Sequence, residues 1–549
     1  MAGNALYYGD NLDVLRESIA DESVDLVYLD PPFNSKANYN VLFRAPTGAQ
    51  SEAQIEAFED TWHWNQHAEN AFDQVMVSGN TDAADMLRAM RAFLKENDMM
   101  AYITMMAVRL LELHRVLKPS GSLYLHCDPT ASHYLKLILD SIFGAHRFQN
   151  EVIWKRTSAH SAAIRWGDVH DVILYYVKSH TFTWNTVVTE YGEEYKERYK
   201  NKGKDGLLWS DDNLTAPGIR HGDSGAVWKG FNPIGRGNHW KISNAAVALI
   251  VGDEKTKALS TTEKLDLLDA NGLIHWPKSG GFPRFKRYLG TGLRVQDIIM
   301  DIAPINSQAQ ERMHYPTQKP VELLDRILSV SSNPGDVVLD PFCGCGTTVY
   351  SAQKLGRMWI GIDITHLAIS LIERRLKGAF LGIALDVHGT PKDIAGAHDL
   401  ACRDKYQFQW WATSLIDAQP YGGKKKGADG GIDGLIYFKS DARVTERAIV
   451  SVKGGGVSVP MVRDLKGVLD REKAPIGVFL TLEPPTRPME TEAASAGFYT
   501  LGDRQYPRLQ IITIEQALHG TKPAIPLIDT GAAFRQPARE APSSQPKLI

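Results

Sequence analysis

Cysteine is scarce in this chain. Its 549 residues include four cysteines, Cys127, Cys343, Cys345 and Cys402. They are too few and too unevenly spaced for a disulfide framework, and the Cys-x-Cys pair at 343 and 345 has no second ligand pair, which argues against a zinc site. We therefore expect a protein of a reducing compartment, the cytoplasm.

Long hydrophobic runs are also absent. No apolar stretch reaches the roughly 18 residues that a membrane-spanning helix needs, and the start, MAGNALYYGD, lacks the pattern of a signal peptide. We therefore predict no association with a membrane. With 43% apolar and 23% charged residues, the composition is that of a globular protein, and the length predicts about three or four domains.

A strong excess of one charge is missing too. The net charge of −3 gives no overall signal for nucleic acid. Residues 151–300, however, hold 21 Lys and Arg against 17 Asp and Glu, a local charge of +4, and seven of the twelve tryptophans. Cations suit phosphates and aromatic rings suit unstacked bases, so this segment is a candidate for nucleic-acid contact. The alternative is that the rings form the core of a small domain.

The order of the predicted elements indicates an α/β sheet written in two halves. Strands alternate with helices before residue 150 and again after residue 305, which is typical of a parallel sheet, and the sequence between is irregular and rich in Gly and Trp. A new composition begins near 390, and the end is rich in Pro, Ser and charge, which predicts disorder. The expected parts are a catalytic half (1–149), an insertion (150–305), a cofactor-binding half (306–388), a C-terminal domain (389–530) and a disordered tail (531–549).

The stretch VDLVYLDPPF ends a predicted buried strand in Asp30, Pro31, Pro32 and Phe33. The two prolines stop the strand and stiffen the backbone. A carboxylate and an aromatic ring are therefore presented in a fixed geometry. This rigidity favours a functional site over an ordinary loop.

A second strand end, DVVLDPFCGCGTT, places Asp340 before two glycines and the start of a helix. The glycines allow a ligand to approach the backbone at a helix N-terminus, and the next strand ends in Asp363, which can accept hydrogen bonds from ribose hydroxyls. The third glycine of a dinucleotide motif is absent, because position 349 is Val. A nucleoside cofactor without pyrophosphate, such as S-adenosylmethionine, fits this pattern better than NAD.

Together the two motifs resemble those of the β-class DNA amino-methyltransferases. HYPTQKPVELLDRIL (314–328) and LYYGDNLDVL near the N-terminus are further features of that family, and the resemblance covers about residues 5–385. It implies a Rossmann-like S-adenosylmethionine-dependent methyltransferase sheet with an inserted target-recognition region. The cofactor-binding residues that it implies are Asp10, Thr317, Lys319, Asp340, Phe342, Gly344, Gly346, Thr347 and Asp363.

The resemblance implies methyl transfer to the N6 amine of an adenine flipped out of double-stranded DNA, within a restriction-modification system. Asp30 and the Pro31 carbonyl would accept hydrogen bonds from the amine, Phe33 would stack on the base, and Pro32 would keep the loop rigid. Cytosine-N4 methylation is the alternative, although that group often carries Ser in place of the acid. Cytosine-C5 chemistry is disfavoured because the chain has no Pro-Cys.

The insertion supplies the candidate contacts to DNA. Its basic residues could bind phosphates or guanine edges, although a solvated surface role is an equal alternative for each. They are Lys155, Arg156, Arg165, Arg284, Lys286 and Arg287. The resemblance to this family also makes a homodimer plausible. The sequence itself determines neither the oligomeric state nor the DNA site that is recognised.

The C-terminal third resembles the Mrr-like branch of the PD-(D/E)xK restriction endonucleases. KKKGADGGIDG and RAIVSVKGG would place Asp433 and Lys453 around Mg²⁺ and a phosphate. Ser451 stands where the family has Glu or Gln, so cleavage is in question. Two alternatives stay open: a defence protein in which this nuclease is the main activity, and a degenerate nuclease fold used for binding.

Overall fold

The structure is a computed structural model that divides into two compact units. One unit contains Met1–Asn185 and Gln296–Leu548, and the other contains Thr186–Val295. The described residues are 3–32, 38–44 and 50–59 (backbone only for these two), 63–157, 166–203, 206–290, 292–306, 309, 311–313, 315, 317–421, 430–441 and 444–526.

A nine-stranded sheet forms the centre of the first unit. Its first five strands in spatial order are β16 (Ile298–Ile299), β6 (Phe148–Lys155), β7 (His170–Val177), β5 (Leu117–Cys127) and β2 (Val24–Leu29). The remaining four are β17 (Val337–Asp340), β18 (Met358–Asp363), β1 (Ala5–Tyr8) and β19 (Asp386–His388). The six neighbouring strands β5, β2, β17, β18, β1 and β19 run parallel to one another, and β7 is antiparallel to β5 and β6. The predicted α/β sheet in two sequence halves is confirmed.

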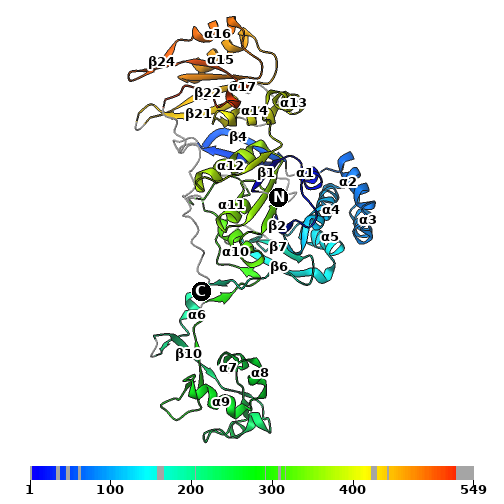
Figure 1. Cartoon of the computed structure of the whole chain (residues 1–549), viewed down its shortest axis with the longest axis vertical. Helices are drawn as coiled ribbons and strands as arrows, with labels where there is room; N and C mark the ends of the chain where they lie inside the picture. Colours follow the sequence, from blue (N-terminus) through cyan, green and yellow to red (C-terminus); the bar gives the residue numbers. More distant parts are fainter. Residues whose placement is uncertain are drawn as a thin grey trace. The chain divides into compact units, whose positions relative to one another are not determined.

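Helices cover both faces of this sheet, because alternate residues of the buried strands point to opposite sides. Val27 and Leu29 of β2 belong to one core, and Leu26 and Tyr28 belong to the other. In Figure 1, the helices of the N-terminal half lie on one side of the strands and those that follow the insertion lie on the other. The first group is α1 (Asn11–Ser18), α2 (Gln66–Met76), α3 (Thr81–Leu94), α4 (Asp98–Val116) and α5 (Ser132–Phe143), and the second is α10 (Val321–Ser331), α11 (Thr347–Lys354) and α12 (His366–Ala379).

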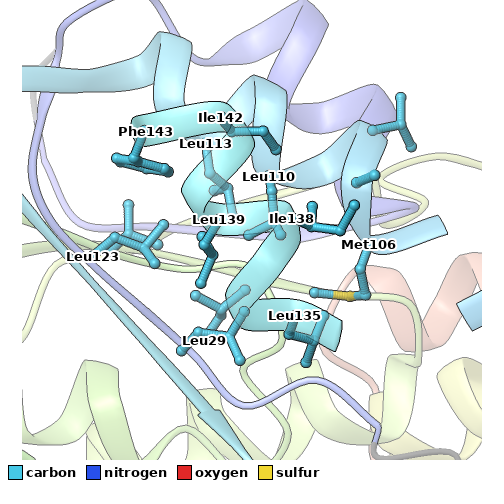
Figure 2. Close-up of a cluster of buried hydrophobic side chains, with 14 of the residues drawn as sticks. Leu29, Met106, Leu110, Leu113, Leu123, Leu135, Ile138, Leu139, Ile142 and Phe143 are labelled. Carbon is cyan, nitrogen blue, oxygen red and sulfur yellow. The ribbon is translucent and has the colours of Figure 1, made fainter. Parts of the chain in front are cut away.

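The core beneath the predicted catalytic strand is made of buried aliphatic and aromatic side chains. Figure 2 shows side chains of α4 and α5 interdigitating over Leu29 and Leu123, the residues of β2 and β5 that face them. Leu29 is fully buried and directly precedes Asp30. This packing fixes the end of β2, from which the site residues extend.

The second unit is small and rich in aromatic residues. It contains a four-stranded sheet, two short two-stranded pairings and a helical subdomain. Its elements are β8 (Val188–Thr189), α6 (Glu193–Lys196), β9 (Asn201–Lys202), β10 (Leu208–Asn213), β11 (Thr215–Pro217), β12 (Asn238–Trp240), α7 (Asn244–Val251), α8 (Asp253–Ala258), α9 (Thr261–Ala270), β13 (Ile274–His275), β14 (Arg284–Tyr288) and β15 (Leu293–Arg294). This unit is narrower than the predicted insertion of 150–305, because β6 and β7 complete the main sheet.

The tryptophans of residues 151–300 divide between core and surface. Four are buried, with Trp228 and Trp240 in the core of the second unit and Trp154 in the main sheet. Three are exposed, of which Trp166 at 95% is the most open. Most of these tryptophans are therefore core residues, which was the alternative to nucleic-acid contact.

The C-terminal domain is built on a second, five-stranded sheet. Its order is β20 (Gln419–Pro420), β21 (Gly434–Lys439), β22 (Thr445–Lys453), β23 (Ile476–Thr481) and β26 (Leu509–Thr513). Side chains of α13 (Ile394–Arg403), α14 (Lys405–Leu415) and α17 (Ile514–Leu518) share one core with this sheet, and those of α15 (Val459–Glu472) and α16 (Arg487–Ala494) share the other. This domain also contains the hairpin of β24 (Phe498–Leu501) and β25 (Arg504–Pro507). A separate hairpin, β3 (Asn38–Arg44) with β4 (Gln50–Glu59), belongs to the N-terminal half of the chain.

None of the helices in the described ranges combines the length and apolar character required to cross a bilayer.

Candidate active site

The two predicted motifs lie on neighbouring strands. β2 and β17 pair in parallel, with Val338 opposite Leu26 and Leu339 opposite Val27. Asp30 follows the carboxyl end of β2, and Asp340 is the last residue of β17. Ligands of open α/β sheets bind beyond this edge. Two segments that are far apart in the chain are thus brought to one place.

A cavity of about 300 Å³ lies at that edge. It brings together the catalytic segment, the glycine loop, the end of β18 and the start of α1. Its lining residues are Gly9, Asp10, Asn11, Asp30, Pro31, Pro32, Met105, Arg109, Tyr315, Thr317, Pro341, Phe342, Gly344, Asp363, Ile364 and Thr365. Phe33, the predicted stacking ring, lies outside the described residues.

The loop after β17 uses glycine at two positions where a side chain would clash with neighbouring residues of the protein. Gly344 has φ +52°, and a Cβ there would lie 3.1 Å from the Tyr315 ring. Gly346, the residue that caps α11, has φ +73°, and its Cβ would lie 2.7 Å from Ile372. The next residue, Thr347, is buried. Glycine is therefore required at 344 and 346 by both conformation and space.

Two carboxylates organise this loop. Asp363 accepts hydrogen bonds from the Gly344 amide (2.9 Å) and from the amide and hydroxyl of Thr365 (2.9 and 2.8 Å). Asp340 accepts from the Phe342 amide at 3.0 Å and is 3% exposed. Burial raises the pKa of Asp363 to about 6. Burial, and then the nearby charges of Asp30 and Asp363, raise the pKa of Asp340 to about 7.

Asp10 is held by a buried arginine. Its carboxylate caps α1 by accepting from the Leu12 amide and forms an ion pair with Arg109 at 2.9 Å. Arg109 is 4% exposed and also donates to Asn11 at 2.5 Å. The sequence reasoning missed Arg109, although a charged residue on the apolar face of AVRLLEL was a usable signal. Asn11 and Arg109 therefore join Asp10 in the lining of the cavity.

Lys319 lies against the predicted catalytic acid. Its Nζ is 2.5 Å from Asp30 Oδ2, and the two side chains are 9% and 15% exposed. The sequence placed Lys319 with the cofactor-binding residues, whereas its neighbour Thr317 is the one that lines the cavity. The partner of Lys319 could not be read from a pattern, because 289 residues separate it from Asp30.

A buried polar chain runs beneath the catalytic strand. The Tyr28 hydroxyl lies 2.8 Å from His126 Nδ1, and His126 Nε2 lies 3.1 Å from Asp171. Arg156 completes the chain at 3.2 Å from the other oxygen of Asp171. Arg156, predicted to contact DNA, is thus anchored by a buried carboxylate with its side chain 41% exposed.

The other predicted DNA contacts differ in their surroundings. Lys155 is exposed at the end of β6, and Arg165 lies outside the described residues. Arg284, Lys286 and Arg287 lie on β14 beside the acidic strand β10. Arg284 pairs with Asp211, Arg287 lies 3.2 Å from Asp212, and Lys286 donates to the Gly272 carbonyl at 2.9 Å.

The nuclease-like residues lie in two places, with Asp433 just before β21 and with Ser451 and Lys453 at the end of β22. Asp433 is buried and accepts from Gln409 at 3.0 Å, from the Ser451 hydroxyl at 3.3 Å and from the Val452 amide at 2.7 Å. Within the described ranges, the structure has no group of three His, Cys, Asp or Glu residues able to hold a metal ion. This donor set does not fit the carboxylate-rich site that Mg²⁺ prefers, so we derive no cleavage step from it.

Restoring an acid beside Asp433 is expected to create a cation site. Ser451→Glu should raise the melting temperature by a few degrees in about 10 mM Mg²⁺, because a second carboxylate lets the ion bind the folded state. The wild type and the neutral Ser451→Gln control should show no such rise in differential scanning fluorimetry. A comparable rise in the wild type would show that it already binds the ion.

Two models of protein families match the sequence of this chain. A DNA methylase model matches residues 24–374, well over half of the 549 residues. The chain belongs to the DNA methylase family. A restriction endonuclease model matches residues 403–506. The predicted pairing of an amino-methyltransferase with an Mrr-like domain is therefore confirmed, and the chain is a DNA methyltransferase of the restriction-modification type.

The chain is also similar to individual proteins of known sequence or structure. The type II methyltransferase M.EcaI of Enterobacter cloacae is 30% identical over 380 residues, which is 68% of this chain and 69% of the relative. The DNA adenine methyltransferase YhdJ of Escherichia coli is 45% identical over 83 residues, 15% of this chain and 28% of the relative. Among solved structures, a DNA modification methylase of Thermus thermophilus complexed with S-adenosyl-L-methionine has 15% identity, 71% and 99% coverage and a TM-score of 0.33.

Proposed function

We propose that this methyltransferase uses S-adenosylmethionine to methylate the N6 amine of an adenine flipped out of double-stranded DNA. The observation that carries the proposal is the shared cavity lined by Asp30 and Pro31 on one strand end and by Pro341, Phe342 and Gly344 on the next. Acceptors for an amine and a cradle for a nucleoside cofactor thus line the same space.

The residues present fit S-adenosylmethionine. Gly344 lines the cavity without a side chain, and Asp10 and Asp363, which also line it, offer carboxylate oxygens to hydroxyl and amine donors. Asp340, beneath the loop, adds negative charge near a cationic amino group. When bound, the cofactor supplies a methyl group activated by its attachment to a sulfonium. The role of the loop itself is to bind and orient.

The DPPF segment would hold and activate the base. An aromatic amine is a poor nucleophile, because its lone pair is delocalised into the ring. Hydrogen bonds from its two N–H groups to the Asp30 carboxylate and the Pro31 carbonyl would favour a pyramidal nitrogen. The lone pair of this nitrogen would then face the methyl group of the cofactor. Fixed acceptors of this kind act mainly by positioning and electrostatics. The rigid Asp-Pro-Pro backbone supplies the required orientation.

Adenine is preferred over cytosine because the motif begins with Asp. The similarity to an adenine-acting relative supports this choice, although the cytosine-N4-specific PvuII methyltransferase is also among the structural neighbours, at 13% identity and a TM-score of 0.32. The decisive experiment is mass spectrometry of nucleosides from DNA of cells that express the chain. N6-methyladenine is expected; N4-methylcytosine alone would assign the other amine, and neither base would end the proposal.

Cofactor affinity is expected to rise with pH. The pKa values of about 7 for Asp340 and about 6 for Asp363 mean that both carboxylates ionise between about pH 5 and 8, and their ionised forms favour a cation and hydroxyl donors. Calorimetry should give about tenfold tighter binding of S-adenosylmethionine at about pH 8 than at about pH 5.5. Asp340→Asn should lose the part of this dependence that Asp340 contributes and keep the part that Asp363 contributes at lower pH. A flat profile in the wild type would contradict the prediction.

The same carboxylates predict a stability change of opposite sign. A folded pKa above the unfolded value means that the cofactor-free folded state binds extra protons between about pH 4 and 7. The contribution of these groups is therefore complete below about pH 4 and is lost as the pH rises through about 6 and 7. Thermal melts of the cofactor-free protein at about pH 8 should show Asp340→Asn to be more stable than the wild type.

A further inference from the structure

The ion pair between Lys319 and Asp30 has no role in the function proposed so far. Lys319 Nζ lies 2.5 Å from Asp30 Oδ2, whereas the Thr317 carbonyl, another of its acceptors, is 3.4 Å away. A contact of this length between two nearly buried side chains is a charge-assisted hydrogen bond, which is both stronger and more directional than a neutral one. The lysine therefore constrains the orientation of the carboxylate.

The backbone around Lys319 is held independently of any ligand. Gln318 accepts from the Met313 amide at 2.7 Å and donates to the Glu311 carbonyl at 2.6 Å. The Glu311 carboxylate in turn accepts from the Val321 amide at 3.1 Å, in the first turn of α10. Lys319 thus extends from a segment fixed on both sides, as a positioning group requires.

A second carboxylate lies within the electrostatic reach of Lys319. Burial alone would raise the pKa of Asp171, but the His126 hydrogen bond and the charges of His126, Lys319 and Arg156 bring it below its usual value. Asp171 belongs to the buried chain beneath β2. The Lys319 charge is therefore compensated from two sides and can stay in place while Asp30 interacts with a base.

We propose that Lys319 is a positioning residue for methyl transfer: it binds Oδ2 of Asp30 and so directs Oδ1 towards the target amine. This inference rests on the proposed function, because it assigns the amine-accepting role to Asp30. It departs from the cofactor-binding role predicted from the sequence. It also explains why Lys319 is nearly buried beside the acid while Thr317 faces the cavity.

The first test measures how much the ion pair between Lys319 and Asp30 contributes to stability, and it requires no enzymatic activity. Lys319→Met leaves Asp30 uncompensated in a nearly buried place, which should lower the melting temperature of the full chain by about 3 °C or more. Adding Asp30→Asn to Lys319→Met should recover most of the loss, so that the two changes are non-additive. Strictly additive shifts would show that the pair does not form, and would overturn the inference.

The second test separates positioning from cofactor binding. Lys319→Gln should lower kcat for methyl transfer to DNA about 100-fold, the effect of a misoriented acceptor, and should leave the Kd for S-adenosylmethionine within about twofold. Lys319→Arg should recover part of the rate because it keeps a charged donor. The matched control is Lys377→Gln, on an exposed lysine paired with Glu373, which should change neither value.

Two outcomes would overturn the inference. A Kd weakened about tenfold or more with an unchanged kcat at saturating cofactor would make Lys319 a cofactor ligand. A kcat within about twofold of the wild type in Lys319→Gln would remove the positioning role. A wild-type chain that methylates no DNA would instead refute the proposed function, and the melting experiment would still decide whether the pair exists.

Discussion

Asp30→Ala is expected to lower kcat for DNA methylation about 10³-fold, at the upper end of the effects seen when one electrostatic group is removed from an active site. The alanine removes the acceptor that would face the amine, and it also leaves the Lys319 ammonium, now without its 2.5 Å contact to Asp30, next to the base. Both effects disfavour a reactive nitrogen. Initial rates with labelled S-adenosylmethionine and a DNA of known modified sequence would measure the loss.

The binding of the cofactor should change far less in this variant. Asp30 lines the same cavity, but the loop after β17 and Asp363 are untouched, so the Kd should stay within about threefold. Asp85→Ala is the matched control, because the Asp85 side chain is 74% exposed on α3 and pairs with the nearby Arg88. Wild-type rates in Asp30→Ala would show that the amine is held by other residues.

The sequence was most informative where function restricts the residue type. Asp30, Pro31, Pro32 and Gly344 were singled out from local chemistry, and they line one cavity because β2 pairs with β17. The alternating strands and helices predicted that sheet. Local motifs and sheet order together therefore predicted the main parts of the cavity.

Contacts between distant segments were beyond this reasoning. Arg109 meets Asp10 across 99 residues, and Lys319 meets Asp30 across 289. The sequence shows that Arg109 lies in an apolar stretch and that Lys319 lies in a Pro-containing one. The acidic partner of each depends on how α4 and α10 pack against the sheet. The role of Lys319 in binding the cofactor stays a prediction, and its contact with Asp30 is what the sequence could not supply.

Cross-strand pairing limited the predicted DNA interface in the same way. The run RFKRY supplied three cations, and the sequence alone could not show that β10 places Asp211 and Asp212 alongside it. Ion pairs between partly exposed side chains are weak, so phosphates could still compete for these residues. Their role in DNA binding stays a prediction, as does that of Lys155.

Gly346→Ala is expected to weaken the binding of S-adenosylmethionine about 100-fold. A methyl group at φ +73° costs about 1–2 kcal/mol in backbone strain, and the new Cβ would lie 2.7 Å from Ile372, a fully buried residue of α12 that cannot move aside without disturbing the core. The loop must therefore shift, and the wall that Pro341, Phe342 and Gly344 give to the cavity shifts with it.

The control for this change isolates the clash from the backbone strain. Gly382 has nearly the same conformation, φ +74°, but its Cβ would meet no atom within 4 Å among the described residues. Gly382→Ala should thus cost only the strain, seen as a modest fall in melting temperature with an unchanged Kd. Calorimetric titration of both variants gives the comparison. Equal Kd values for Gly346→Ala and Gly382→Ala would mean that the clash with Ile372 does not disturb cofactor binding, and the loop at 346 would have no part in it.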